Sequence, residues 1–293
     1  MVGERGLHRA AVVALFLLPS LLPLLAFMVI PMVASLGLTA FEWNLIRPPQ
    51  FTGLDNFSRL VGDPSFHAAV LHTLQFLLGY LPLVMVGGLA LALALNQSLR
   101  GLAIFRTAYF LPVVTSWVVV ALMWKWLLNP GSGIVNWALG LVGISGPGWW
   151  TEPAWAMPSI ILASAWKDLG FVMVIFLAGL QAIPNDYYEA ASVDGAGRWH
   201  RLRHVTLPLL SPATFFVLII SLINGFQVFD QVWVMTGGGP AGASSVVVTE
   251  VVRNAFSYGQ FGYAAAMSWV LFAAILLVTL FQFRLQRRWV TYA

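Results

Sequence analysis

A polar island lies at Pro184-Asn-Asp-Tyr-Tyr-Glu189-Ala190-Ala191-Ser-Val-Asp194-Gly195-Ala-Gly-Arg198-Trp-His-Arg201-Leu-Arg203-His-Val205-Thr-Leu207-Pro208, between two long apolar runs. Proline lacks the N–H that the helical ladder needs, so the two prolines predict helix boundaries at the ends of the island. Almost everything on either side of it is apolar. A polar segment in such a chain indicates either a partner or a catalytic role.

The island itself predicts two short helices lying outside the bilayer. Asn185 suits an N-cap, and Asp186 and Glu189 place negative charge near a helix N-terminus, where the dipole favours it. This first helix is predicted to run to about residue 193 and to break at Gly195. The second is predicted to begin near residue 198 and to stop before Pro208, which restarts the chain into the membrane.

The composition of the whole chain indicates a membrane protein. Its 293 residues are 59% hydrophobic and 9% charged, whereas a water-soluble domain carries about 25% charged residues. We therefore expect a single transmembrane domain over residues 1–293. Cysteine is absent, which excludes disulfides, thiolate metal sites and cysteine nucleophiles. The net charge of +4 does not indicate nucleic-acid binding, because the basic residues cluster at the ends of apolar runs.

The apolar runs predict an all-α membrane protein with six transmembrane helices. A span needs roughly 20 apolar residues to cross the ~30 Å hydrocarbon layer. Six stretches qualify, at about 10–38, 68–95, 104–128, 156–182, 208–235 and 262–283. The first is too long for a signal-peptide core and lacks a clear cleavage pattern, so it is predicted to be retained. Small residues such as Gly87-Gly88 and Ala264-Ala265-Ala266 predict close helix packing, within the chain or against a second subunit.

The distribution of Lys and Arg predicts the orientation. One set of connections carries Arg5, Arg9, Arg100, Arg106, Arg198, Arg201, Arg203, Arg284, Arg287 and Arg288, and the other carries only Arg47, Arg59 and Arg253. Positive residues favour the cytoplasmic side. Both termini and the island between predicted helices 4 and 5 are therefore expected in the cytoplasm. The external connection from Asn129 to Pro153 has no Lys or Arg, and its tryptophans suit the headgroup level.

Two interpretations of the island remain open from its residues. In the first, the island is an ordinary solvated loop whose arginines interact with anionic lipid headgroups. The run Glu189-Ala190-Ala191 instead forms a small, flat face beside a carboxylate, which suits docking against a protein.

An ordered set of motifs now adds a family resemblance. Glu189-Ala190-Ala191, Gly195, Val205 and Leu207-Pro208 follow the spacing of the EAA motif of binding-protein-dependent ABC importer permeases, with Val205 where Ile is usual. Ala178 to Pro184 before the motif, and Phe229-Asp230 and Thr236 to Pro240 after it, resemble the carbohydrate-uptake branch with its maltose-type and glycerol-3-phosphate-type permeases. The resemblance covers most of the chain and is most specific over residues 166–240.

The resemblance implies a transport subunit of the bacterial cytoplasmic (inner) membrane that is not an enzyme. Its coupling helix would dock on an ATPase subunit through Glu189, Ala190, Ala191, Asp194, Gly195 and Arg198. Implied partners are a second homologous permease, two ATPase subunits, an extracytoplasmic solute-binding protein and the lipid bilayer. The only lysines, Lys125 and Lys167, each follow Trp, so no phosphate-cradling P-loop exists. No cofactor is expected in this chain, because ATP and Mg²⁺ would be bound by the ATPase partners.

Polar faces within the predicted spans indicate where a solute could bind. Ionisable groups in spans are costly and mark functional sites by default. The candidate substrate-binding residues are Ser164, Lys167, Asp168, Phe171, Ser221, Asn224 and Gln227, which recur at helical spacing on the fourth and fifth spans. In the maltose-type relatives these helices line the sugar site. Alternatively, Lys167 and Asp168 neutralise groups on neighbouring helices. Lys125 can extend its ammonium group to the outer surface, which favours a structural role. Asp230 is predicted near the outer surface, where a structural role and a role in lining the solute pathway both remain open.

Several other functions are weighed against a sugar permease. A glycerol-3-phosphate or other phosphorylated polyol would suit Lys167 but would be repelled by Asp168, so a neutral saccharide is favoured. An ion-driven secondary carrier would transport without an ATPase. A membrane-embedded transferase would need clustered carboxylates and a metal, and no paired Asp motif occurs. His67 and His72 are predicted outside and His200 and His204 inside, so a shared metal site is not expected.

Overall fold

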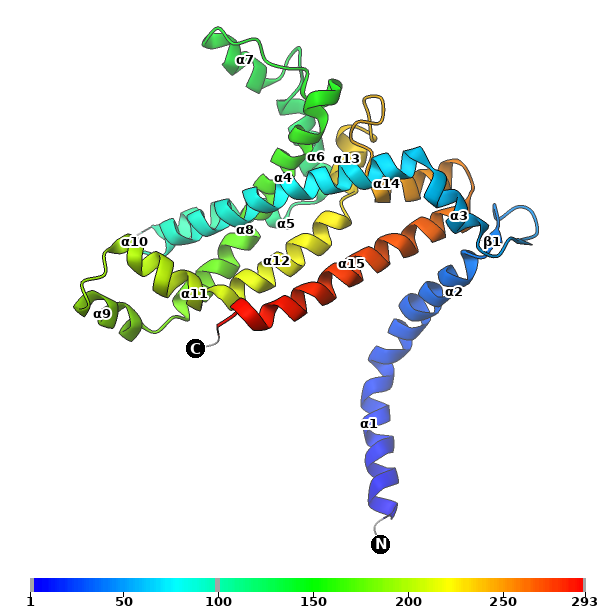
Figure 1. The fold of residues 1–293 in the computed structure, drawn as a ribbon, viewed down its shortest axis with the longest axis horizontal. Coiled ribbons are helices and arrows are strands. Elements are labelled where there is room, and N and C mark those ends of the chain that lie inside the picture. The colour runs from blue at the N-terminus through cyan, green and yellow to red at the C-terminus, as the bar shows by residue number, and fades with distance from the viewer. Residues whose placement is uncertain (1–2, 98–100, 292–293) are drawn as a thin grey trace. The chain divides into compact units, whose positions relative to one another are not determined.

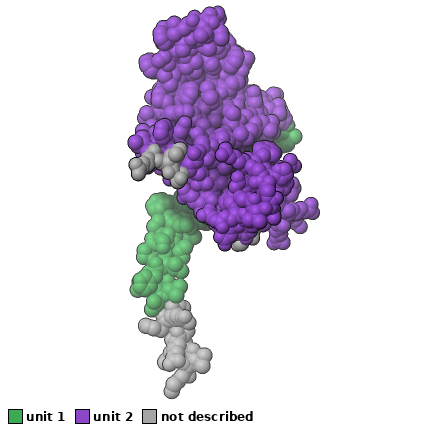
Figure 2. Space-filling view, turned by 90° about the vertical axis from the view of Figure 1, so that its left-hand side faces the viewer, with its two compact units in different colours: residues 1–63, 251–270 green, residues 64–250, 271–293 purple. Residues whose placement is uncertain are grey.

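The computed structural model describes residues 3–97 and 101–291, with side chains described from residue 12 onward. Arg100, which entered the charge count, lies outside the described residues, and the side chains of Arg5 and Arg9 are likewise not described. The chain divides into two compact units, residues 1–63 with 251–270 and residues 64–250 with 271–293 (Figure 2). Each unit is described by itself below.

The first unit begins with a long apolar helix and continues into a small hairpin. Its elements are α1 (Gly3–Leu24), the π-helical turn η1 (Leu25–Val29), α2 (Ile30–Leu38), β1 (Phe41–Glu42), β2 (Gln50–Phe51), α3 (Asp55–Gly62) and η4 (Arg253–Ser257). The strands pair antiparallel with Phe41 opposite Phe51. The buried Asn56 amide ties α3 to the hairpin by donating to the Thr39 and Phe41 carbonyl oxygens at 2.9 and 3.0 Å.

The second unit contains most of the remaining helices (Figure 1). They are α4 (Pro64–Leu95), α5 (Leu102–Val114), α6 (Trp117–Leu127), α7 (Ile134–Leu141), η2 (Trp149–Thr151), α8 (Pro153–Gln181), α9 (Asn185–Val193), α10 (Arg198–Arg201), η3 (Leu202–Thr206), α11 (Leu207–Leu209), α12 (Ser211–Phe226) and α13 (Asp230–Met235). The helices α14 (Val247–Val252) and α15 (Phe261–Trp289) each begin in one unit and end in the other. Within the second unit, α8 is central and packs against α4, α5 and α12.

Close packing around α8 depends on the absence of side chains at a few positions. A Cβ at Gly88 of α4 would overlap the Val172 side chain, and one at Gly87 would meet the tip of Leu169. A Cβ at Gly170 would overlap the Tyr109 carbonyl oxygen, so backbone of α5 lies directly against α8. Small residues permit such approach between membrane helices. The predicted role of Gly87-Gly88 in packing within the chain is therefore confirmed.

The described residues contain four helices long and apolar enough to cross a membrane, and up to six spans if each bent pair is counted as one. The four are Val12–Leu38, Pro64–Leu95, Pro153–Gln181 and Phe261–Trp289. The predicted span at 104–128 is not one straight helix, because α5 and α6 meet at 103° across Thr115 and Ser116. The predicted span at 208–235 is also divided, since α12 ends at Phe226 and α13 starts only at Asp230.

The island at residues 184–208 forms the two predicted helical segments, with two corrections. The N-cap of α9 is Pro184, and Asn185 is its first helical residue. The second segment does not stop before Pro208, because helical geometry continues from Arg198 through a π turn to Leu209, and the bend of 64° follows there. Proline is tolerated near the start of a helical turn, and the π turn just before it accommodates the missing N–H.

The break at Gly195 is confirmed as a Schellman helix end. Gly195 has φ +77°, a left-handed conformation that glycine adopts without steric cost. The Ala196 N–H donates to the Ala191 carbonyl at 2.9 Å and the Gly195 N–H to the Ser192 carbonyl at 3.1 Å. These two bonds are those of the Schellman motif, which satisfies the last carbonyls of a helix.

Candidate functional site

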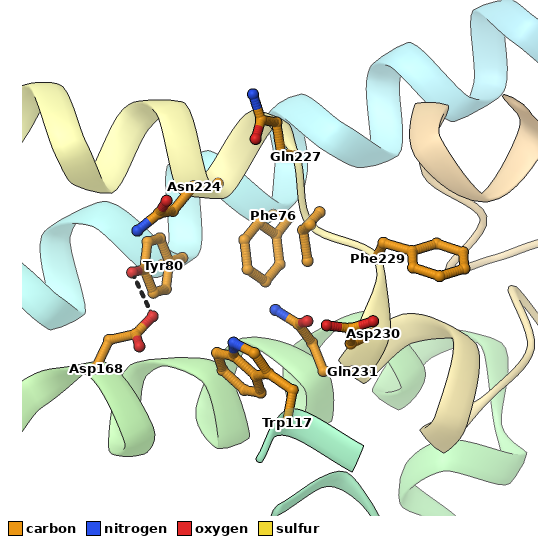
Figure 3. A pocket seen from close by; sticks show the side chains of 11 residues that line it. Phe76, Tyr80, Trp117, Asp168, Asn224, Gln227, Phe229, Asp230 and Gln231 are labelled. Carbon is orange, nitrogen blue, oxygen red and sulfur yellow. Dashed lines mark hydrogen bonds between the residues drawn. The ribbon is translucent and has the colours of Figure 1, made fainter. Parts of the chain in front are cut away.

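A polar pocket lies among five helices and one unwound segment of the second unit (Figure 3). Its volume is about 220 Å³. The lining residues come from α4 (Phe76, Tyr80), α6 (Trp117), α8 (Asp168), α12 (Asn224, Gly225), the following loop (Gln227, Val228, Phe229) and α13 (Asp230, Gln231). Aromatic rings, amides and carboxylates thus meet in one pocket inside the bundle.

A buried hydrogen bond between Tyr80 and Asp168 forms one wall. The Tyr80 hydroxyl donates to Asp168 Oδ2 at 2.7 Å, and Figure 3 shows the two side chains pointing toward one another. Tyr80 is 2% exposed, and its ring stacks on Phe76 with centroids 5.2 Å apart. Ser221 of α12, a predicted substrate-binding residue, is 3% exposed and does not line the pocket. A bond to a carboxylate is stronger than a neutral one, so this pair fixes the position of Asp168.

The opposite wall is the break between α12 and α13. The helix ends at Phe226, and Phe229 has φ −147° and ψ −63°, outside helical geometry. Helical backbone is interrupted in a membrane only where protein or a cavity can satisfy its polar groups. Here the exposed side chains of Asn224, Gln227 and Asp230 line the pocket. The break therefore turns polar groups inward instead of leaving them in lipid.

Lys167, the neighbour of Asp168, has a different environment. It is 5% exposed, its Nζ donates to the Val113 carbonyl oxygen at 3.0 Å and lies 4.7 Å from the centre of the Trp117 ring. Val113 is in the last turn of α5, where carbonyl groups lack helical partners. Lys167 thus satisfies a carbonyl at the bend between α5 and α6. It does not line the pocket.

The seven predicted substrate-binding residues are distributed unevenly around this pocket. Asp168, Asn224 and Gln227 line it. Ser164 is fully buried behind it and accepts a 3.2 Å hydrogen bond from Nε2 of Gln231, which does line it. Phe171 packs against the hydrophobic core and is not a lining residue.

Among the lining residues that the predicted substrate-binding set omitted, three lie outside the fourth and fifth predicted spans, namely Phe76, Tyr80 and Trp117. All three lie in stretches that we treated as uniformly apolar. A tyrosine inside a span carries a polar tip that needs a partner when buried, and this was the available signal for Tyr80. Trp117 directly follows the polar pair Thr115-Ser116 in the middle of a predicted span, which was the available signal for a break there.

The segment 184–208 presents a second candidate surface. Tyr188 and Ser192 hold α9 to the next helical segment, through a 3.2 Å bond between the Tyr188 hydroxyl and Thr206 Oγ1 and a 3.1 Å bond from Arg201 to Ser192 Oγ. The predicted coupling residues Glu189, Ala190, Asp194, Gly195 and Arg198 are exposed, and Ala191 is half-buried. Two large apolar side chains beside them are also exposed, Val193 at 88% and Trp199 at 68%. Such exposure suits docking.

Comparison with known proteins assigns the family. Residues 84–291 match the family described as binding-protein-dependent transport system inner membrane component. The chain belongs to this family. The resemblance drawn from residues 166–240 is therefore confirmed, and the chain is a permease of the ABC transporter type.

Similar proteins cover nearly the whole permease. A probable ABC transporter permease, YesP of Bacillus subtilis (strain 168), is 38% identical over 282 residues, which are 94% of this chain and 91% of YesP. The trehalose/maltose transport system permease MalF of Thermococcus litoralis is 33% identical over 274 residues, covering 93% and 92%. A bacterial alginate ABC transporter, solved in complex with an alginate pentasaccharide-bound periplasmic protein, contains a chain with TM-score 0.86, 26% identity and 100% coverage of both chains.

Proposed function

We propose that this chain is the membrane subunit of an ATP-driven importer that takes up a sugar or sugar-like solute delivered by an extracytoplasmic binding protein. The observation that carries the proposal is the Asp168 pocket. Saccharides are recognised by a few placed polar groups together with aromatic faces. Asp168, Asn224 and Gln231 supply polar groups, and Phe76 and Trp117 supply rings.

The charges around the pocket favour a neutral solute over a phosphorylated polyol. Asp168 and Asp230 line the pocket and would repel a phosphate group. Lys167, the cation that would suit a phosphate, has its Nζ bonded to Val113 and placed over Trp117. Moving it to the pocket would leave a helix-terminal carbonyl without its donor, which is costly away from water. A neutral polyol avoids both costs.

The coupling part of the proposal rests on α9. We place its exposed residues, including Glu189 and Arg198, against a separate ATPase subunit, with a second homologous permease completing the pathway. ATP and Mg²⁺ would then be bound by the ATPase subunits, and this chain would hold no cofactor. In the proposed orientation both termini and α9 face the cytoplasm, because ten of the counted arginines fall on that side against three on the other.

Reconstitution in liposomes tests the proposal. The chain would be combined with its second permease, ATPase subunits and binding protein, and uptake of labelled neutral saccharides would be compared with uptake of glycerol-3-phosphate. We expect saccharide uptake that needs internal ATP and external binding protein and that persists when ionophores collapse ion gradients. Uptake driven by an ion gradient in the absence of the ATPase would overturn the proposal.

A charge-reversal variant tests the coupling role separately. We expect Glu189→Lys to abolish uptake and to weaken co-purification of the ATPase, because the reversed charge lies on the exposed face of α9. Glu42→Lys is the matched control, since Glu42 is an exposed carboxylate on β1 of the other unit. Normal ATPase association and uptake by the Glu189 variant would assign the coupling contact elsewhere while leaving the transport proposal standing.

A further inference from the structure

The exposed side of α7 is apolar. Successive residues of a helix point about 100° apart, so four residues of α7 share an arc of about 100° on one side of it. They are Ile134, Trp137, Ala138 and Leu141. All four are exposed, with Trp137 at 64% and Leu141 at 68%. Figure 1 shows α7 extending from the end of α6 to one side of the other helices of the second unit. This apolar face is therefore not covered within the chain.

The polar side of α7 faces the protein. Asn136 is the only polar residue of the helix and lies opposite the apolar face. Its Nδ2 donates to the Pro130 and Pro147 carbonyl oxygens, both at 3.1 Å, and its Oδ1 accepts a hydrogen bond from Trp149 Nε1 at 2.5 Å. A helix at a protein–water surface does the reverse, with its apolar side on the protein and its polar side outward. The orientation of α7 thus suits an apolar surrounding.

Hydrogen bonds hold α7 close to the end of α6. The chain turns directly after α6, where the Gly133 N–H donates to the Asn129 carbonyl oxygen at 2.8 Å. The returning arm is tied to the last turn of α6, because Trp150 Nε1 donates to the Lys125 carbonyl oxygen at 3.2 Å and the Lys125 ammonium lies 4.8 Å from the centre of the Trp150 ring. Tryptophan is enriched where membrane helices meet the headgroups. These ties therefore keep α7 near the level of the headgroups.

The connection that contains α7 is uncharged, which bears on what covers the apolar face. Residues 126–151 contain no Asp, Glu, Lys, Arg or His. A soluble partner that docks reversibly is met by a polar rim and guided by charge, and between encounters it would leave this face in water. Close contact between membrane helices uses small residues, whereas this face presents an indole and branched side chains. Lipid requires neither feature, and its contact is permanent.

We propose that α7 lies in the bilayer interface at this end of α6 and α8, with the face formed by Ile134, Trp137, Ala138 and Leu141 in contact with acyl chains just below the headgroups. A helix of this kind buries its apolar face about 5–10 Å into the boundary between headgroups and acyl chains. Because Asn136 is bonded to the connection itself, the polar side needs no water.

An anchor at this level would fix the depth of α6 in the membrane. The first residue of α6, Trp117, lines the Asp168 pocket. The contact of α7 with lipid would thus hold one wall of the pocket at a constant depth. The inference requires only that α6 and α8 cross a membrane, so it is independent of the solute and of the side on which α7 lies.

The test measures the depth of α7 in liposomes that contain the full chain. The chain has no cysteine, so single cysteines introduced by Ala138→Cys, Leu141→Cys and Ser132→Cys can each carry a spin label. Oxygen concentrates in the acyl region, and a water-soluble nickel chelate stays outside it. We expect a higher oxygen-to-nickel accessibility ratio at positions 138 and 141 than at position 132, which lies in the polar turn before α7.

A second pair of variants tests whether apolar contact holds the helix in place. Leu141→Glu should lower the ratio measured at position 138, because a charge now lies on the apolar face, whereas Ser132→Glu, in the exposed turn, should leave it unchanged. An unchanged ratio in Leu141→Glu would overturn the anchoring role.

Two further results would overturn the proposal. If the labels at positions 138 and 141 are as accessible to nickel as the label at position 132, then the face lies in water. If both labels are protected from oxygen and nickel alike, alone or once a binding protein is added, then a protein covers the face instead of lipid.

Discussion

The bond between Tyr80 and Asp168 gives the sharpest prediction about the pocket. Tyr80→Phe removes a single hydroxyl, and the ring keeps its place because it is 2% exposed and stacked on Phe76 at 5.2 Å. What is lost is the donor that lies 2.7 Å from Asp168 Oδ2. The variant therefore changes the position of Asp168 without opening a cavity.

The expected size of the effect follows from the type of bond. Hydrogen bonds to charged groups contribute about 1.5–3 kcal/mol, more than neutral ones do. If Asp168 must be held in place to bind solute, the same energy corresponds to about a tenfold to hundredfold loss in transport. We expect Tyr80→Phe to lower the uptake rate by at least about tenfold while the amount of protein in the membrane stays unchanged.

A double-mutant cycle in proteoliposomes measures this bond. Uptake would be compared for Tyr80→Phe, Asp168→Ala and the double variant, with Tyr109→Phe as the control, since Tyr109 is 43% exposed on α5 and is not a lining residue. We expect the double variant to lose scarcely more than Asp168→Ala alone, which gives a coupling energy of about 1.5–3 kcal/mol. Additive losses, with a coupling below about 0.5 kcal/mol, would refute the role assigned to the pair.

Two structural predictions concern the packing around α8. Gly170→Ala should lower the free energy of unfolding by about 1–3 kcal/mol or more, because the new methyl group meets the Tyr109 backbone. Gly87→Ala should lower it less, because its methyl group meets only the flexible tip of Leu169. Thermal unfolding in detergent compares the two variants, and equal losses would contradict this prediction. Lys167→Met should also lower the free energy of unfolding by about 1–3 kcal/mol, because the hydrogen bond to the Val113 carbonyl is lost. Altered solute selectivity without this loss of stability would instead show that Lys167 binds solute.

The parts of the fold that were predictable are those set by local properties of the sequence. Continuous hydrophobicity predicted the long helices α4, α8 and α15, because only a helix satisfies its own backbone over that length in lipid. Prolines, glycines and first-turn acidic residues predicted α9 and its end at Gly195. In each case the physical cause lies within a few residues of its effect.

The breaks in the third and fifth predicted spans depend on tertiary contacts. The stretch 104–128 is apolar enough for one span apart from the polar pair Thr115-Ser116, yet α5 and α6 meet at that pair at 103°. The bend is stable because a group on another helix, the Lys167 ammonium, satisfies a carbonyl at the end of α5. A window of neighbouring residues contains no information about a partner 54 positions away.

The pocket was predicted in part for the same reason. Periodicity placed Asp168 and Asn224 on polar faces of their helices, and both line the pocket. Tyr80 was missed because its partner is 88 residues away along the chain. Its apolar ring also made the surrounding span look uniform. A buried hydroxyl needs a partner, but the sequence does not say which of several polar groups supplies it.

The adjacent pair Lys167-Asp168 shows how one helix can serve two purposes at consecutive positions. Neighbouring residues on a helix point about 100° apart, so the two charges need not act on the same object. Lys167 turns toward the bend between α5 and α6, and it carries Trp117 beneath its ammonium group. Asp168 turns toward Tyr80 and the pocket. Because Trp117 lines the same pocket, the structural bond of Lys167 also sets the position of a ring in the pocket wall. The two interpretations of the pair are therefore complementary, with Asp168 facing the pocket and Lys167 shaping it from behind.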